Sequence, residues 1–166
     1  MRYVKFLILA LGLVAVGATA GRTQLFMMDN PNTGKSAPEF TLPTLSGRAT
    51  ALSAFREGKK AIIFFWATWC PHCRAALKEL NERQKEFVNK DIRIVLVDVG
   101  EPAAVVKKYV EKYKVTLEVF LDEDEGESEK YDIIGVPTFF FVNKEGVIKE
   151  ILHQLPENYD EILSKP

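Results

Sequence analysis

Cysteine is scarce in this chain, because Cys70 and Cys73 are the only two among 166 residues. A scaffold held together by several disulfides is therefore excluded, and so is a zinc ribbon, which would need a second cysteine pair. Covalent haem attachment would require a histidine directly after the second cysteine, and Arg74 stands there. The two cysteines must be explained as one pair with two residues between them.

An excess of either charge is also missing, since 22 Lys and Arg oppose 23 Asp and Glu. A sequence-independent nucleic-acid binder needs a basic face to neutralise phosphates, so we expect no nucleic acid among the partners. The hydrophobic share of 47% and the charged share of 27% are ordinary for a globular protein. This composition excludes disordered, collagen-like and coiled-coil classes, and the length allows one domain with a real core.

The apolar run at the N-terminus is short. It follows Arg2 and Lys5, extends from Phe6 to Val16, and is followed by the small residues Ala18-Thr19-Ala20. This order is typical of a secretory signal peptide. Residues 6–21 number 16, fewer than the ~20 that span a bilayer, although an uncleaved inner-membrane anchor over these residues remains an alternative. Both interpretations predict an extracytoplasmic, periplasmic domain.

Three segments follow from this pattern. Residues 1–20 are expected to be a signal peptide or an N-terminal membrane anchor. Residues 21–35, which include the turn-forming Asn30-Pro31-Asn32-Thr33-Gly34, are expected to be a linker. Residues 36–166 are expected to form the folded domain.

The domain pattern alternates between strands and helices. A turn at Ser46-Gly47-Arg48 separates two short strands, and two continuous apolar runs are typical of strands buried on both faces. Strands are expected over residues 40–42, 49–52, 61–66, 92–97, 138–142 and 147–152, and helices over residues 71–90, 102–113 and 157–163. This order predicts an α/β fold with a central mixed sheet flanked by helices and an extra N-terminal β-hairpin.

The chemistry lies in Trp69-Cys70-Pro71-His72-Cys73, at the expected start of a helix. Unpaired backbone N–H groups and the helix dipole would stabilise a thiolate on Cys70, lowering its pKa below the free value of about 8.5. A stabilised thiolate attacks disulfides and also leaves readily. We therefore predict that Cys70 attacks and Cys73, one turn deeper, resolves. Pro71 suits the first helical turn, and His72 adds a hydrogen-bond donor or a positive charge.

Two alternative roles for the cysteine pair stay open. A structural disulfide is one, although a bridge over three positions constrains almost no loop. A site for Cu(I) is the other, because two thiolates suit this soft ion. A zinc site would need about four ligands, and the chain offers only His72 and His153 beside the cysteines. We expect neither a metal nor a cofactor.

The stretch Phe65-Trp66-Ala67-Thr68-Trp69-Cys70-Pro71-His72-Cys73, together with Gly135-Val136-Pro137-Thr138 downstream, resembles the thioredoxin superfamily. The stretch Ala37-Pro38-Glu39-Phe40-Thr41-Leu42-Pro43 resembles the entry of its exported TlpA/ResA-like, redoxin-type branch. The similarity extends from Ser36 to about Pro166. It implies a thioredoxin fold and thiol-disulfide exchange.

The resemblance also implies a cis peptide bond before Pro137 that faces the cysteine pair. Such a turn would present the backbone of Val136 for strand-like pairing with a substrate segment. Trp69, Val136, Pro137 and Thr138 are accordingly the expected substrate-binding residues. Trp66, in the strand, is expected in the core, whereas Trp69 is expected at the rim of the substrate surface.

The chain departs from family patterns at two positions. Thioredoxin has a buried acid six residues before the first cysteine, where this chain has Phe64, and some cytochrome-maturation members have Glu where this chain has Ala76. Glu101 matches an acid that those members place near the site, which makes it the candidate general base. The alternative for Glu101 is an ordinary acid at a helix N-terminus, favoured by the dipole.

Three functions remain from these observations. The favoured one is an extracytoplasmic thiol-disulfide oxidoreductase, a monomer that reduces disulfides of proteins including apocytochrome c and exchanges electrons with a membrane or periplasmic redox partner. A redoxin-type peroxidase is an alternative, although its Pro-x-x-x-Thr-x-x-Cys loop would need proline where Ile63 stands. A Cu(I)-binding dithiol chaperone is the other.

One acidic stretch, residues 122–129, is expected to lie outside the site. Asp122-x-Asp124 begins like a calcium-binding EF-hand loop, but Gly126 comes one position early and no Glu closes the loop. We expect a solvated loop, with Ser128 opening a short helix.

Overall fold

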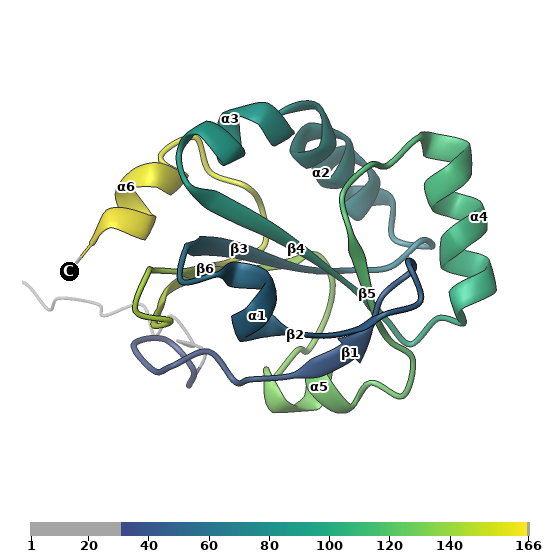
Figure 1. Ribbon diagram of the computed structural model, residues 1–166, viewed down its shortest axis with the longest axis horizontal. Coiled ribbons are helices and arrows are strands. Elements are labelled where there is room, and N and C mark those ends of the chain that lie inside the picture. Colours follow the sequence, from purple (N-terminus) through teal and green to yellow (C-terminus); the bar gives the residue numbers. More distant parts are fainter. Residues whose placement is uncertain (1–30, 166) are drawn as a thin grey trace, which may run out of the picture.

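The computed structural model describes residues 31–165 (Figure 1). The predicted leader, residues 1–20, and the first part of the predicted linker lie outside the described residues. Within the part that is described, no helix has both the length and the apolar character needed to cross a membrane.

A five-stranded mixed sheet forms the centre of the domain, in the order β5-β4-β3-β6-β7. Strands β3, β4 and β5 are parallel, whereas β6 is antiparallel to β3 and β7 is antiparallel to β6. The strands of this sheet are β3 (Lys60–Trp66), β4 (Ile92–Val99), β5 (Val119–Asp122), β6 (Thr138–Val142) and β7 (Ile148–Leu152). β3 lies at the middle of the order, so the residues that follow it emerge at the centre of one sheet edge.

The remaining elements cover the two faces of the sheet. The N-terminal hairpin pairs β1 (Thr41–Pro43) with β2 (Ala49–Ala51), as the turn signal predicted. The helices are α1 (Leu52–Arg56), α2 (Pro71–Glu82), α3 (Gln84–Asn89), α4 (Ala103–Tyr113), α5 (Gly126–Lys130) and α6 (Tyr159–Ser164). The expected α/β fold with an extra N-terminal hairpin is confirmed.

Two apolar cores explain the continuous apolar runs. On one face, Phe64 and Trp66 of β3 pack with side chains of α2, α3, α4 and α6. On the other face, Ile63 and Phe65 pack with β1, α1 and Tyr131. Successive strand residues point to opposite faces, so a strand between two cores needs apolar side chains at every position. Trp66 is fully buried, as expected.

The helix expected over residues 71–90 is divided into two. Arg83 ends α2 and precedes α3, with φ −91° and ψ 9°, which lies outside the helical region. Its guanidinium pairs with Glu79 and Glu86 and lies over the rings of Phe87 and Tyr159. The change of direction lets Phe87 enter the core against Tyr159, with ring centroids 5.2 Å apart.

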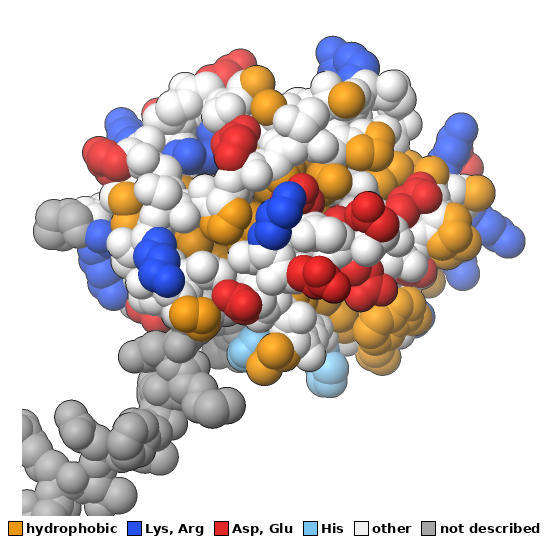
Figure 2. All heavy atoms as spheres, turned by 90° about the horizontal axis from the view of Figure 1, so that it is seen from below, with side chains coloured by type: hydrophobic (Ala, Val, Ile, Leu, Met, Phe, Trp, Pro, Cys, Tyr) orange, Lys and Arg blue, Asp and Glu red, His pale blue; other side chains and the backbone are white. Residues whose placement is uncertain are grey.

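The acidic stretch is not simply a solvated loop, which corrects the expectation. Asp122 ends β5 and is fully buried. Its carboxylate accepts hydrogen bonds from the backbone N–H of Glu127 (3.0 Å) and from both the N–H (2.7 Å) and hydroxyl (2.6 Å) of Ser128. The helix α5 begins at Gly126, and Ser128 lies within it. Glu127 is partly buried, whereas four other acids of this stretch are exposed: Glu123, Asp124, Glu125 and Glu129. Figure 2 shows acidic side chains gathered on the face that is seen from below.

The described end of the predicted linker contacts the sheet. The N–H of Gly34 donates to the carbonyl of Ile148 (2.8 Å), and the N–H of Ile148 donates to the carbonyl of Lys35 (2.9 Å). Ser36 forms an antiparallel bridge with Val147. Residues 34–36 therefore lie against the start of β7.

Candidate redox site

Cys70 and Cys73 form a disulfide at the start of α2, with Cα atoms 5.3 Å apart. The chain leaves β3 at Trp66 and turns so that the N–H of Cys70 donates to the carbonyl of Ala67 (3.2 Å). Cys70 then occupies the N-cap position of α2, and Pro71 begins the helix. Proline costs nothing there because a first-turn N–H has no intrahelical partner.

The sulfur of Cys70 meets the helix N-terminus as predicted. Its Sγ atom accepts the backbone N–H of Cys73 at 3.1 Å. Cys73 is fully buried, whereas 3% of Cys70 is exposed. When the disulfide is reduced, the same N–H and the helix dipole favour a thiolate on Cys70 over one on Cys73.

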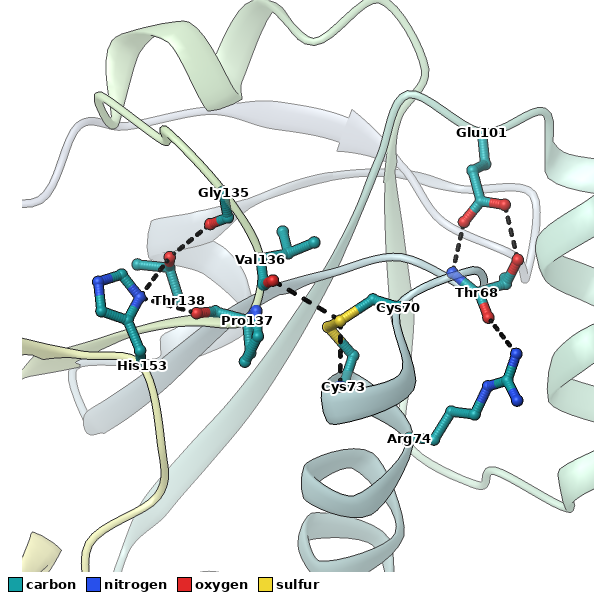
Figure 3. The surroundings of a disulfide bond; sticks show 10 residues. All are labelled: Thr68, Cys70, Cys73, Arg74, Glu101, Gly135, Val136, Pro137, Thr138 and His153. Carbon is teal, nitrogen blue, oxygen red and sulfur yellow. Dashed lines mark hydrogen bonds between the residues drawn. A yellow bond between two sulfur atoms is a disulfide. The ribbon is translucent and has the colours of Figure 1, made fainter.

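The peptide bond between Val136 and Pro137 is cis. Its turn faces the cysteine pair, because the Sγ of Cys70 lies 3.7 Å from the carbonyl oxygen of Val136 (Figure 3). Thr138 is buried, and its hydroxyl donates to the carbonyl of Gly135 at 2.7 Å. Thr138 thus stabilises the turn that places Val136 beside the sulfur.

His153 directly follows β7 and supports this turn. The sequence analysis considered it only as a metal ligand. Its Nδ1 lies 2.9 Å from the carbonyl oxygen of Pro137, a geometry in which Nδ1–H donates. A groove of about 460 Å³ has His72, His153 and Pro137 in its lining. No periodicity or motif in the sequence joins His153 to a residue 16 positions away.

Glu101 holds the loop before Cys70. Its carboxylate is buried and accepts both the N–H (2.5 Å) and the hydroxyl (2.6 Å) of Thr68. The backbone carbonyl oxygen of Thr68 accepts a hydrogen bond from Nη2 of Arg74 at 3.5 Å (Figure 3). The N–H of Ala103 at the start of α4 is accepted by Glu123. Glu101 is therefore directed to the redox loop rather than to the cap of α4.

Asp98, near the end of β4, is a buried acid that the sequence analysis missed. Neither carboxylate oxygen has a hydrogen-bond donor within the described part of the chain. Burial, and next the negative charge of Glu101, raise the pKa of Asp98 to about 8. Asp98 is paired in register with Trp66, whose indole N–H is also buried without a partner among residues 31–165. The feature of the sequence that could have indicated Asp98 is a single acid near the end of the apolar run that forms β4.

Large apolar side chains are exposed around the disulfide. Trp69, directly before Cys70, is 65% exposed, as expected for a rim residue. Ile134, two residues before Val136, is 92% exposed. Exposed apolar side chains next to a reactive centre are typical of an interaction surface.

The fold and this site define a class: a thioredoxin-like protein with a redox-active dithiol. Its sequence matches the AhpC/TSA family over residues 33–151, and the chain belongs to that family. The predicted resemblance to ResA-like members of the thioredoxin superfamily is confirmed, and the protein is a thiol-disulfide oxidoreductase.

Named relatives agree with this assignment. The thiol-disulfide oxidoreductase ResA of Geobacillus kaustophilus is 33% identical over 119 residues, which cover 72% of this chain and 68% of that protein. ResA of Geobacillus thermodenitrificans is 31% identical, covering 89% of this chain and 84% of that protein. The thioredoxin domain of a thiol-disulfide oxidoreductase from Bacteroides vulgatus superposes with a TM-score of 0.69 at 28% identity, covering 78% and 94% of the two chains.

Proposed function

We propose that this protein works outside the cytoplasm as a reductase of protein disulfides, with apocytochrome c among its substrates. The observation that supports this most is the placement of Cys70 at a helix N-terminus, 3.7 Å from the carbonyl of a cis-proline turn. The signal-like order of residues 1–20 supports the location, and the similarity to ResA proteins supports the class of substrate.

The reaction proceeds in two exchanges. The Cys70 thiolate attacks one sulfur of the substrate disulfide, forming a mixed disulfide while the other substrate sulfur leaves as a thiolate. Cys73 then loses its proton and attacks Sγ of Cys70, and the second substrate sulfur leaves. Two electrons pass to the substrate, whose thiolates take protons from Cys73 and from water. A membrane or periplasmic dithiol partner reduces the Cys70–Cys73 disulfide again.

The residues around the sulfur have distinct parts in this proposal. The backbone of Val136 pairs with the substrate segment as an added strand. Trp69 covers the substrate chain beside the sulfur, and His72 donates a hydrogen bond or a charge to the thiolate. Glu101 fixes Thr68, two residues before Cys70, so that the sulfur keeps its position during both exchanges.

The test separates the two cysteines. We expect Cys70→Ser to abolish turnover of insulin disulfides with a thiol reductant. We expect Cys73→Ala to keep the first exchange and to accumulate mixed disulfides with substrate, detected by mass spectrometry. Faster alkylation of Cys73 than of Cys70 in the reduced protein would contradict this order of attack.

The same preparation tests the alternative functions. Turnover of peroxide faster than of protein disulfides would replace the proposal with a peroxidase. Stoichiometric binding of Cu(I) by the reduced protein without disulfide turnover would replace it with a copper chaperone.

A further inference from the structure

A groove of about 710 Å³ lies between α2 and the end of α4, beginning beside the disulfide. Figure 1 shows these two helices on the same side of the molecule. One stripe of α2 lines it, at positions 71, 74, 75, 78 and 82. These positions follow the helical spacing of three or four residues, so they form one continuous wall. The groove therefore starts at Pro71, the residue next to Cys70.

Apolar and aromatic side chains form part of the groove. Leu77 and Val115 line it together with Tyr109 and Tyr113, whose ring centroids are 4.5 Å apart. Tyr109 in turn packs on the buried Trp66, with centroids 5.4 Å apart. Tyrosine supported by a core residue provides a large contact area at a low cost in side-chain entropy, as in binding surfaces of proteins.

The charge of the groove is opposite to that of the protein. Its lining contains one acid, Glu82, and four bases: Arg74, Lys78, Lys112 and Lys114. The whole chain has a net charge of −1, and the exposed acids of the α5 segment lie elsewhere. Glu82 is 3.8 Å from Lys78 and both are well exposed, so water screens this pair. Three positive charges remain in excess.

The length of the groove suits a short peptide. From position 71 to position 82 a helix rises about 16 Å. An extended chain rises ~3.3 Å per residue, so about five residues fit along this wall. A polypeptide whose cysteine sits at Cys70 has two directions in which to continue. In the proposed function Val136 pairs with the chain on one side of that cysteine, and the groove that begins at Pro71 is available to the chain on the other side.

We propose that this groove binds a segment of the substrate polypeptide that is rich in Asp and Glu and that flanks the cysteine attacked by Cys70. The proposal rests on the proposed function, because it requires a protein disulfide as substrate. The carboxylates of the segment meet Lys78, Lys112 and Arg74, while its apolar side chains lie on Tyr109 and Tyr113. The groove selects which disulfides react quickly, and the exchange chemistry is unchanged.

The experiment measures the second-order rate of oxidation of the reduced protein by two disulfide-containing peptides. The peptides are identical except that five residues on one side of the cysteine contain either three Glu or three Gln. The variants are Lys112→Glu and Lys78→Glu. Lys107→Glu is the matched control, since Lys107 is exposed on the same helix α4 but does not line the groove.

For the Glu peptide we expect each groove variant to lower the rate constant about five- to tenfold at low salt, and the effect to shrink at 0.5 M salt. For the Gln peptide, and for Lys107→Glu with either peptide, we expect changes below about twofold. Equal effects of Lys107→Glu and Lys112→Glu would overturn the proposal, and so would equal rates of the wild-type protein with the two peptides.

Two further measurements isolate the role of the groove. Bis(2-hydroxyethyl) disulfide is too small to reach the groove and should react equally with the wild-type protein and both groove variants. If the protein exchanges with this compound but does not prefer the Glu peptide, only the groove proposal fails; if it exchanges with no disulfide, the proposed function fails. A groove used by a second copy of the chain would appear as a wild-type dimer that Lys112→Glu dissociates in sedimentation, and this would overturn the proposal.

Discussion

Asp98 and Asp122 lie near the ends of neighbouring parallel strands, and both are fully buried. They differ in what surrounds the carboxylate. Asp122 accepts three hydrogen bonds from Glu127 and Ser128, whereas Asp98 has no donor among residues 31–165. The two acids are therefore equally buried, but only the carboxylate oxygens of Asp122 accept hydrogen bonds.

The difference separates a structural acid from an acid available for chemistry. A buried carboxylate that accepts several N–H and O–H donors fixes the segment that donates to it, which for Asp122 is α5. A buried carboxylate without donors is disfavoured in its charged form, and the nearby charge of Glu101 adds to this effect. Asp98 thus lies in a position to hold a proton near the loop that Glu101 fixes.

The largest expected effect tests Asp98 through the pH dependence of stability. The folded state raises the pKa of Asp98 from 3.8 to about 8, so the unfolded state ionises first and the free energy of unfolding falls as the pH rises between these values. Asp98→Asn removes this contribution. Between pH 5 and pH 8 we expect the free energy of unfolding of the variant to rise by about 4 kcal/mol relative to that of the wild type. Urea unfolding at a series of pH values measures this difference. Parallel curves for the two proteins would contradict the raised pKa.

Asp122→Asn should act in the opposite direction. The amide cannot accept all the bonds of the carboxylate, so donors at the start of α5 lose their partner. We expect a loss of about 3 kcal/mol in the free energy of unfolding. The loss should be seen in the same urea unfolding experiment. If Asp122→Asn instead stabilised the protein, as we expect of Asp98→Asn, the hydrogen bonds of Asp122 would not distinguish it from Asp98.

Glu101→Gln sharpens the comparison, because Glu101 contacts the loop and also raises the pKa of Asp98. Removal of the Glu101 charge should lower the pKa of Asp98, so the fall in the free energy of unfolding that Asp98 causes should end at a lower pH. Loss of the charge-assisted bonds to Thr68 should slow exchange with insulin by about tenfold, which corresponds to ~1.4 kcal/mol. Thr68→Val is the control for the loop, since it should slow exchange while leaving the pH range in place.

His72→Ala should have the smallest effect, because His72 is exposed and water screens its charge. Removing a donor beside the Cys70 thiolate disfavours the reduced form, so the disulfide becomes less oxidising. We expect the equilibrium constant to change by less than tenfold, which is less than about 30 mV in potential, in a glutathione redox titration. An unchanged constant would leave the helix N-terminus as the source of thiolate stability.

The fold was largely predictable because its main signals are local. The strands β3 and β4 are continuous apolar runs, α4 shows a helical period, and a polar turn at residues 143–146 marks the β6–β7 hairpin. The strand β5 was missed, since four residues that end in Asp122 look like the beginning of an acidic loop. The division between α2 and α3 was missed too, because it depends on Arg83 meeting Tyr159 from the other end of the chain.

The site divides in the same way. The cysteine pair and Pro137 form short motifs, and their contact follows from the resemblance to a known family. Glu101 was found, but its partner Thr68 was not, because a hydrogen bond across 33 positions leaves no pattern in one sequence. Asp98 and His153 were missed for the same reason, because the role of each depends on residues that only the folded sheet brings next to it.

The pairing of residues 34–45 with the sheet has a consequence for association between molecules. Ser36 bridges to Val147 beside β7, and Thr44 bridges to Phe120 of β5, so one stretch of chain reaches from one outer strand of the sheet to the other. Outer strands with free N–H and C=O groups recruit strands from other chains and start aggregation. A single N-terminal segment therefore partly covers both outer strands of the sheet, and it leaves other chains fewer free backbone groups with which to pair.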